Sequence, residues 1–149
     1  MESGYVYGIA RHNDAEGWME LVDIVKENFP GLIIEEYKEV LLRNIVKQSA
    51  LCVKYDNEIV GVLLYSAEQK TLSCMAVHPA HRKKGIASAL VMKMIENFPR
   101  HSKIWVTTFR EGDPKGSAAR ALYKKIGFIE DELILGFDDY PVQKFVLYT

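Results

Sequence analysis

The sequence has few of the features that mark a specialised class of protein. Only two of its 149 residues, Cys52 and Cys74, are cysteines, and they do not form a close pair with the spacing of a metal or redox site. Each lies in an apolar, strand-like segment, so we expect both to be reduced core residues. A chain of this length can bury a core without disulfides or metal ions. We therefore expect one domain over residues 1–149.

Long hydrophobic runs are missing as well. The longest run, Ile59 to Tyr65, is far shorter than the roughly 20 apolar residues that a membrane-spanning helix needs. The first residues also lack the basic-then-apolar pattern of a secretory signal. We expect no membrane partner and a cytoplasmic location.

Neither sign of charge is in large excess. The formal net charge is −1, whereas nonspecific nucleic-acid binding depends on many Lys and Arg contacts to phosphate. Two common nucleotide motifs are also absent: there is no G-x-G-x-x-G, and the segment Gly112 to Ser117 lacks the lysine and spacing of a Walker loop. We expect no nucleic-acid partner, so any anion site must be local.

The periodic segments indicate an α/β fold. We expect strands at 5–10, 50–55, 59–65, 71–77, 104–109, 129–135 and 143–148, and helices with apolar faces within 13–29, 37–45, 85–98 and 117–126. The turn residues Asp56-Asn57 predict a hairpin, and Phe29-Pro30-Gly31 should end the first helix. The first half of the sheet should be largely antiparallel.

The sharpest local signal is the segment Arg82-Lys83-Lys84-Gly85-Ile86-Ala87, which leads from an apolar strand into a helix. The first amide N–H groups of a helix have no partners within the helix and carry the positive end of its dipole. Gly85 removes a Cβ from the approach of an anion, and three cations add attraction. The segment suits a pyrophosphate, although a charge cluster taken alone is more often a solvated loop.

Two motifs resemble the GNAT superfamily of N-acetyltransferases. Arg82-x-x-Gly85-x-Ala87 is similar to its R/Q-x-x-G-x-G/A, and Ala119-x-x-Leu122-Tyr123-x-x-x-Gly127-Phe128 is similar to its A-x-x-L-Y-x-x-x-G-F. The order of segments also matches over nearly the whole chain. The resemblance implies a mixed, mostly antiparallel central sheet flanked by helices on both faces. It further implies that acetyl coenzyme A is the cosubstrate and that its acetyl group passes directly to an amine of a small molecule or peptide.

The resemblance also implies roles for particular residues. The backbone of Met75-Ala76-Val77 should pair with the pantetheine arm and polarise the thioester carbonyl. The residues expected to hold the pyrophosphate are Arg82, Lys83, Lys84, Gly85, Ile86, Ala87 and Ser88. Tyr123 should be the general acid for the leaving thiolate, because its pKa of about 10, above the value of about 8.5 for a thiol, keeps the phenol protonated at neutral pH. Its helical spacing alone would indicate a core aromatic instead.

At two positions the chain departs from the superfamily pattern. Lys83 stands where many relatives have glycine and could add a phosphate contact. Gly116 stands where many have asparagine, and Ser117 could supply the lost polar contact.

The general base is not evident, because no carboxylate lies on the strand before Arg82-Lys83-Lys84-Gly85, hereafter the basic loop. The candidates from flanking loops are Glu35, Glu36, Asp138 and Asp139, and water relayed to backbone carbonyls is an equal alternative. The same four residues suggest a cationic acceptor.

Other interpretations remain open from the sequence. A noncatalytic acetyl coenzyme A sensor or interaction module would keep the anion site without turnover. A homodimer is compatible with the sequence. His78 and His81 flank Pro79 without a third ligand nearby, so we assign them no role and expect no metal.

Overall fold

One mostly antiparallel sheet of seven strands organises residues 4–29 and 31–149, which the computed structural model describes. The strands are β1 (Tyr5–Ile9), β2 (Ala50–Tyr55), β3 (Glu58–Ser66), β4 (Thr71–Val77), β5 (Lys103–Phe109), β6 (Ile129–Leu135) and β7 (Pro141–Tyr148), and the α-helices are α1 (Ala15–Val25), α2 (Ile34–Val46), α3 (Ile86–Glu96) and α4 (Ser117–Ile126). Their order along the chain confirms the predicted order of strands and helices.

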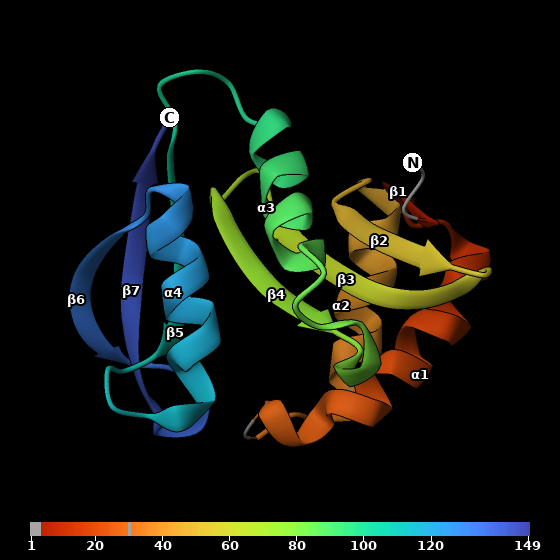
Figure 1. The fold of residues 1–149 in the computed structure, drawn as a ribbon, viewed down its shortest axis with the longest axis horizontal. Helices are drawn as coiled ribbons and strands as arrows, with labels where there is room; N and C mark the ends of the chain where they lie inside the picture. The colour runs from red at the N-terminus through yellow and green to blue at the C-terminus, as the bar shows by residue number, and fades with distance from the viewer. Residues whose placement is uncertain (1–3, 30) are drawn as a thin grey trace.

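The strands lie in the order β1-β2-β3-β4-β5-β7-β6. Within each half of the sheet, β1 to β4 and β5 to β6, neighbouring strands are antiparallel, and β4 and β5 are parallel where the halves meet. The helices α1 and α2 cover one face of the first half, while α3 and α4 lie on the opposite face (Figure 1). The predicted mixed α/β fold with helices on both faces is confirmed.

Local sequence accounts for most element ends. Asp56 and Asn57, with φ of 51° and 66°, form the turn between β2 and β3, as expected for a two-residue hairpin that needs two left-handed residues. The first helix ends earlier than predicted: α1 stops at Val25, and a 3-10 turn, Lys26–Asn28, follows it. Pro30, the central residue of the segment predicted to end this helix, lies outside the described residues.

Two cores hold the helices on the sheet. Trp18 of α1 and Leu41 of α2 are buried on one face. Leu90 and Met94 of α3 are buried on the other face, in the core that also contains Phe145 of β7. In the described part of the chain, no helix has both the length and the apolar character needed to cross a bilayer.

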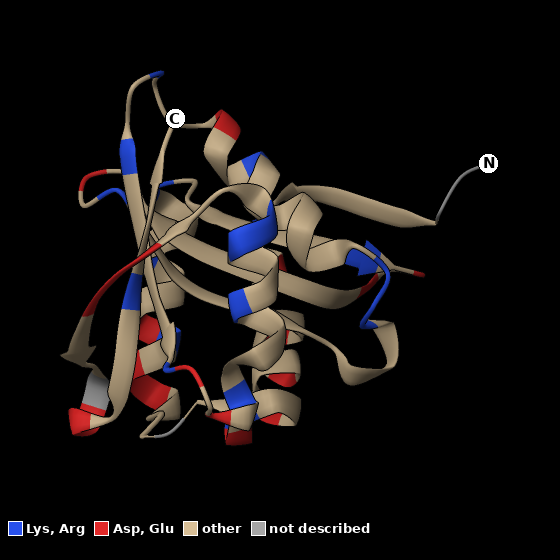
Figure 2. Ribbon diagram, turned by 60° about the vertical axis from the view of Figure 1, so that its left-hand side comes forward, with Lys and Arg blue, Asp and Glu red and all other residues tan. Residues whose placement is uncertain are grey.

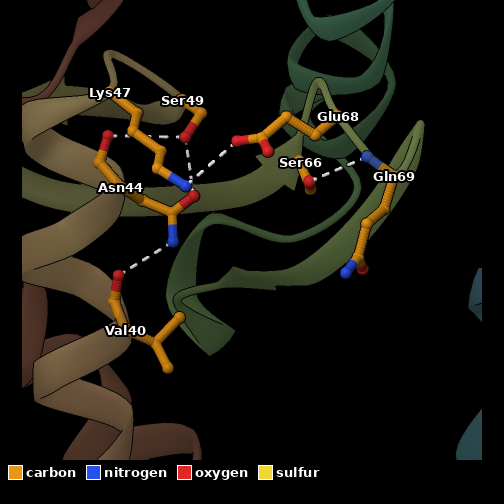
Figure 3. A network of polar contacts seen from close by, with 7 residues as sticks. All are labelled: Val40, Asn44, Lys47, Ser49, Ser66, Glu68 and Gln69. Atoms are coloured by element: carbon orange, nitrogen blue, oxygen red, sulfur yellow. Dashed lines mark hydrogen bonds and ion pairs between the residues drawn. The ribbon is translucent and has the colours of Figure 1, made fainter.

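A small polar network fixes the C-terminal end of α2 (Figure 3). The Asn44 amide donates to the Val40 carbonyl at 2.8 Å, and the Ser49 hydroxyl donates to Asn44 Oδ1 at 2.6 Å. Lys47 and Glu68 form an ion pair at 3.2 Å that joins this end of the helix to the turn after β3. Because α2 carries residues of the site described below, its fixed position matters for function.

Gly61 of β3 allows α3 to approach the sheet closely. A Cβ at this position would lie 2.8 Å from Cγ2 of Ile86, the first residue of α3, which is 1% exposed. Neither atom has room to move in a packed core. The start of α3, and with it the basic loop, is therefore positioned partly by the missing side chain.

We predict that Gly61→Ala lowers the free energy of unfolding by about 1–3 kcal/mol, because it overpacks the contact with Ile86. Denaturant unfolding measures the change. Gly8→Ala is the matched control, since a Cβ on this other strand glycine meets nothing within 4 Å. Equal effects of the two substitutions would show that the close approach does not constrain the fold.

Candidate active site

The two parallel strands at the centre of the sheet meet only at their beginnings. Among the described residues, Thr71 of β4 and Trp105 of β5 are the one pair in register between these strands. The Thr71 hydroxyl donates to the Trp105 carbonyl at 2.9 Å, and the Trp105 amide donates to the Lys70 carbonyl at 3.0 Å. Beyond this point β4 and β5 do not pair. In Figure 1 the strands from β5 to β6 stand apart from the first half of the sheet.

A cavity of about 1050 Å³ occupies this divergence. Its walls include 72–77 of β4 and 106–109 of β5, together with parts of all four α-helices, the basic loop and the connection between β6 and β7. The volume is at the upper end of the range for ligand sites. Met75-Ala76-Val77 lies on the wall, paired with β3 on one side and free of β5 on the other. Its pairing with a pantetheine arm stays a prediction.

A β-bulge turns β4 beside the cavity. Leu64 of β3 pairs with Cys74 and Tyr65 pairs with Leu72, so Ser73 is an extra residue in β4. After the bulge, Met75 and Val77 pack on the core under α3, whereas Cys74 and Ala76 pack on the core under α1 and α2. The cavity therefore has walls from both sides of the sheet.

The basic loop lies at the α3 side of the cavity and forms a continuous blue stretch in Figure 2. The predicted anion-site residues on the wall are Arg82, Lys83, Gly85, Ile86, Ala87 and Ser88. Arg82 Nε donates to the Val77 carbonyl at 3.3 Å, which holds the guanidinium near the end of β4. Lys84 is exposed and does not lie on the wall.

The backbone conformation explains why glycine suits two positions of this loop, Gly85 and the position that Lys83 occupies. Gly85, the N-cap of α3, has φ of 79°, and no atom would contact its Cβ. It is therefore required for its conformation, which L side chains rarely adopt. Lys83 has φ of 61°, which costs a residue with a Cβ about 1 kcal/mol. A lysine at a position where glycine is common is thus strained.

The packing at the start of α4 explains why Gly116 stands where many members of the superfamily have asparagine. Gly116 is buried, and a Cβ on it would lie 2.7 Å from the Cβ of Phe109 in β5. An asparagine there would push these two elements apart. Ser117, predicted to replace its polar contact, is exposed and does not lie on the cavity wall, whereas its neighbours Lys115 and Ala118 do.

Tyr123 of α4 is both a core residue and a cavity residue. Its ring centre lies 5.4 Å from that of Phe128 and 6.1 Å from that of Phe145, and its side chain is 4% exposed. Burial, with the nearby Cys74 thiol as a smaller cause, raises the pKa of Tyr123 well above its ordinary value. Its hydroxyl therefore stays protonated at neutral pH.

Tyr37 and Cys74 are wall residues that the sequence did not single out. Trp18 Nε1 donates to the Tyr37 hydroxyl at 2.9 Å, and this oxygen lies 3.6 Å from Cys74 Sγ. Burial raises the pKa of Tyr37, and it raises the pKa of Cys74 to about 11. Both cysteines are free, as expected. Cys74 is only partly buried, because it faces the cavity as well as the core. Helical and strand periodicity alone placed both residues in a core.

The four candidate bases separate in the structure. Of these described residues, only Glu36 of α2 lies on the cavity wall. Glu35, Asp138 and Asp139 are exposed and lie elsewhere.

The histidines are engaged in local contacts. His81 Nδ1 lies 2.9 Å from the Tyr5 hydroxyl, and His78 Nδ1 accepts from the Ala80 amide at 3.0 Å. Within residues 4–29 and 31–149, no three His, Cys, Asp or Glu side chains are placed to hold a metal ion.

Comparison with known proteins agrees with this geometry. The family model for the acetyltransferase (GNAT) family matches residues 18–128. Among curated proteins there is no match.

Solved structures share the fold at low identity. An acetyltransferase of the GNAT family from Bacillus cereus ATCC 10987 is 23% identical, with a TM-score of 0.75 and 97% of each chain covered. Naa50 of Arabidopsis thaliana, in complex with the bisubstrate analogue CoA-Ac-MVNAL, is 15% identical, with a TM-score of 0.74 and coverage of 98% of this chain and 99% of that one.

The diaminobutyrate acetyltransferase EctA of Paenibacillus lautus, in complex with L-2,4-diaminobutyric acid and coenzyme A, is 20% identical. Its TM-score is 0.72, with 97% of this chain and 94% of that chain covered. These likenesses show a common fold, and the family match covers most of the chain. The chain therefore belongs to the acetyltransferase (GNAT) family.

Proposed function

We propose that this protein binds acetyl coenzyme A and transfers the acetyl group directly to an amine. The observation that carries the proposal is the cavity between β4 and β5, which joins the basic loop to Tyr123. Membership of an acetyltransferase family supports acyl transfer. Similar folds bound to CoA-Ac-MVNAL, or to L-2,4-diaminobutyric acid together with coenzyme A, support the choice of cosubstrate and of an amine acceptor.

The chain offers a separate site for each part of the cosubstrate. The edge of β4 at Met75-Ala76-Val77 has no β5 partner. Apart from the Val77 carbonyl, which accepts from Arg82 Nε, the backbone groups on this edge are available to a pantetheine amide in the manner of an added strand. The N-terminus of α3, with Arg82 and Lys83 beside it on the wall, favours the pyrophosphate through unpaired amides and positive charge.

The reaction then needs one bond formed and one broken. The neutral amine attacks the thioester carbonyl, a C–N bond forms, and backbone amides near Val77 stabilise the oxyanion. The C–S bond then breaks, the nitrogen loses its extra proton to solvent, and Tyr123 donates its hydroxyl proton towards the leaving sulfur. Because the pKa of Tyr123 is raised, full transfer to the thiolate is uphill by about 1.4 kcal/mol per pKa unit. Hydrogen bonding to the developing charge is therefore the main contribution.

Cys74 does not suit the role of a covalent carrier. With a pKa of about 11, only about one molecule in ten thousand holds the thiolate at pH 7, and the thiolate is the nucleophile. Direct transfer needs no such intermediate.

The proton of the acceptor ammonium needs a receiver. Among the described residues of the cavity wall, Glu36 is the only carboxylate, and it is exposed enough to exchange protons with solvent. We propose that Glu36 accepts this proton, directly or through water.

The proposed function is tested by release of free thiol from acetyl coenzyme A over a panel of primary amines, diamines and short peptides. We expect turnover with at least one acceptor class, with the acetylated amine identified by mass. Binding of acetyl coenzyme A without turnover on any acceptor would contradict catalysis and indicate a sensor instead.

Removal of the Tyr123 hydroxyl should slow the chemical step. We predict that Tyr123→Phe lowers kcat by about 10²–10⁴-fold with little change in the KM for acetyl coenzyme A, because the acid acts on the leaving group. Tyr65→Phe is the control, since Tyr65 is also a buried tyrosine but does not lie on the cavity wall. An unchanged kcat in Tyr123→Phe would remove this residue from the mechanism.

The cations of the basic loop should contribute unequally. We predict that Arg82→Ala raises the dissociation constant for coenzyme A about tenfold, because one charge-assisted hydrogen bond is lost. Lys84→Ala should have a much smaller effect, since Lys84 is not on the wall. Calorimetric titration at two salt concentrations measures both. Equal effects would indicate a general attraction by the cluster rather than a placed contact.

The two adjacent glutamates of α2 provide a matched pair for the base. We predict that Glu36→Gln lowers kcat/KM for the acceptor about 100-fold or more at neutral pH. Glu35→Gln should leave kcat/KM unchanged, because Glu35 is similarly exposed but outside the cavity wall. If the two variants behave alike, the proton leaves through water and backbone carbonyls instead.

A further inference from the structure

The cavity continues past Tyr37 to a wall that is mostly apolar. The segment that joins α1 to α2, with the nearest turns of both helices, supplies Val25, Phe29, Leu32, Ile33 and Val40. Ile33 is 48% exposed although it is a large aliphatic residue. An apolar side chain left in water at the mouth of a cavity gains free energy when a ligand covers it.

The connection between β6 and β7 adds an aromatic residue, Tyr140, to the cavity wall. The Tyr140 ring lies edge-to-face with Phe109, with 5.3 Å between the ring centres. Its hydroxyl donates to Asp113 Oδ2 at 3.0 Å, so the polar end of this side chain already has a partner. Val142, on the same side, also lies on the wall.

Few polar groups remain in this part of the cavity for an acceptor. The Tyr37 hydroxyl already accepts from Trp18 and lies beside Cys74, and Asn28 and Glu36 are the other polar residues of the α1–α2 wall. Glu36 can receive one ammonium group. A second cationic or strongly polar group would be placed against apolar side chains, which costs free energy when no partner replaces water.

We propose that the acceptor is a primary amine carried by an apolar chain or ring. The amine lies towards Glu36 and the thioester, and its apolar substituent packs on Phe29, Leu32 and Ile33. This proposal rests on the proposed amine acetylation and names its substrate class. It narrows the cationic acceptor suggested by the four acidic residues to one with a single ammonium group, since three of those described carboxylates lie outside the cavity wall. An alkylamine, an arylalkylamine or the N-terminus of a peptide that begins with an apolar residue has this chemistry.

An apolar amine and a diamine of matched size, together with a larger aromatic amine, test the proposal. We expect kcat/KM for 3-methylbutylamine and 2-phenylethylamine to exceed that for 1,4-diaminobutane at least tenfold. Tetrapeptides that begin with leucine or serine and are otherwise identical form a second arm, which separates a peptide source from a free amine. Equal or better turnover of the diamine, with the serine peptide equal to the leucine peptide, would overturn the proposal.

Binding separates failure of this inference from failure of the proposed function. Calorimetric titration of 3-methylbutylamine into the protein saturated with coenzyme A measures acceptor binding without chemistry. If the apolar amine binds and the diamine does not, but neither is acetylated, the proposed catalysis fails and the apolar acceptor site stands. If the amines react but show no apolar preference, the acetyltransferase stands and this inference fails.

A pair of exposed isoleucines tests the wall itself. We predict that Ile33→Ser raises the KM for 3-methylbutylamine about tenfold, the effect of losing one buried aliphatic contact, with no change in the KM for acetyl coenzyme A. Ile24→Ser is the control, because Ile24 of α1 is 52% exposed and does not lie on the cavity wall. Both positions are exposed enough for the variants to fold. Equal KM values in the two variants would contradict the proposed wall.

Discussion

The divergence of β4 and β5 is the constraint on which the rest of the structure depends. Parallel strands joined by a helix normally pair along their length, yet here one pair of residues, Thr71 and Trp105, is in register among those described. Each unpaired backbone group on the open edge of β4 needs a partner when it is covered. An extended ligand with amide groups can supply those partners. The open edge of β4 therefore favours the binding of the pantetheine arm that we propose.

The chemistry of the cavity follows from burial. Tyr123, Tyr37 and Cys74 come from three different elements, and burial raises the pKa of each. All three therefore stay protonated, so this part of the cavity holds neutral donors rather than anions. In the reaction that we propose, such a site would assist the leaving thiolate without competing with it as a nucleophile. The charged side chains on the wall lie at positions exposed to solvent: Glu36, Arg82, Lys83, Lys115 and Lys125.

Several local rules of the sequence carried through to the structure. The turn residues Asp56 and Asn57 need no tertiary partner to favour a hairpin, and Gly85 is required for its positive φ. Helical period alone also places Tyr123 on the apolar face of α4, about two turns from its start. Gly116 is different: the sequence showed only a departure, and its cause is the approach of Phe109 from β5.

The sequence by itself thus determined the order of elements, the basic loop before α3 and the motif that contains Tyr123, since these depend on period, turn chemistry and short spacing. Only the tertiary structure decided which residues share the cavity. It separated Glu36 from Glu35, left Lys84 and Ser117 outside the wall, and brought Phe29, Leu32 and Ile33 to the acceptor side. The physical reason is that these choices depend on where β4 parts from β5 and on how α1 and α2 pack, which are long-range contacts that no local pattern encodes.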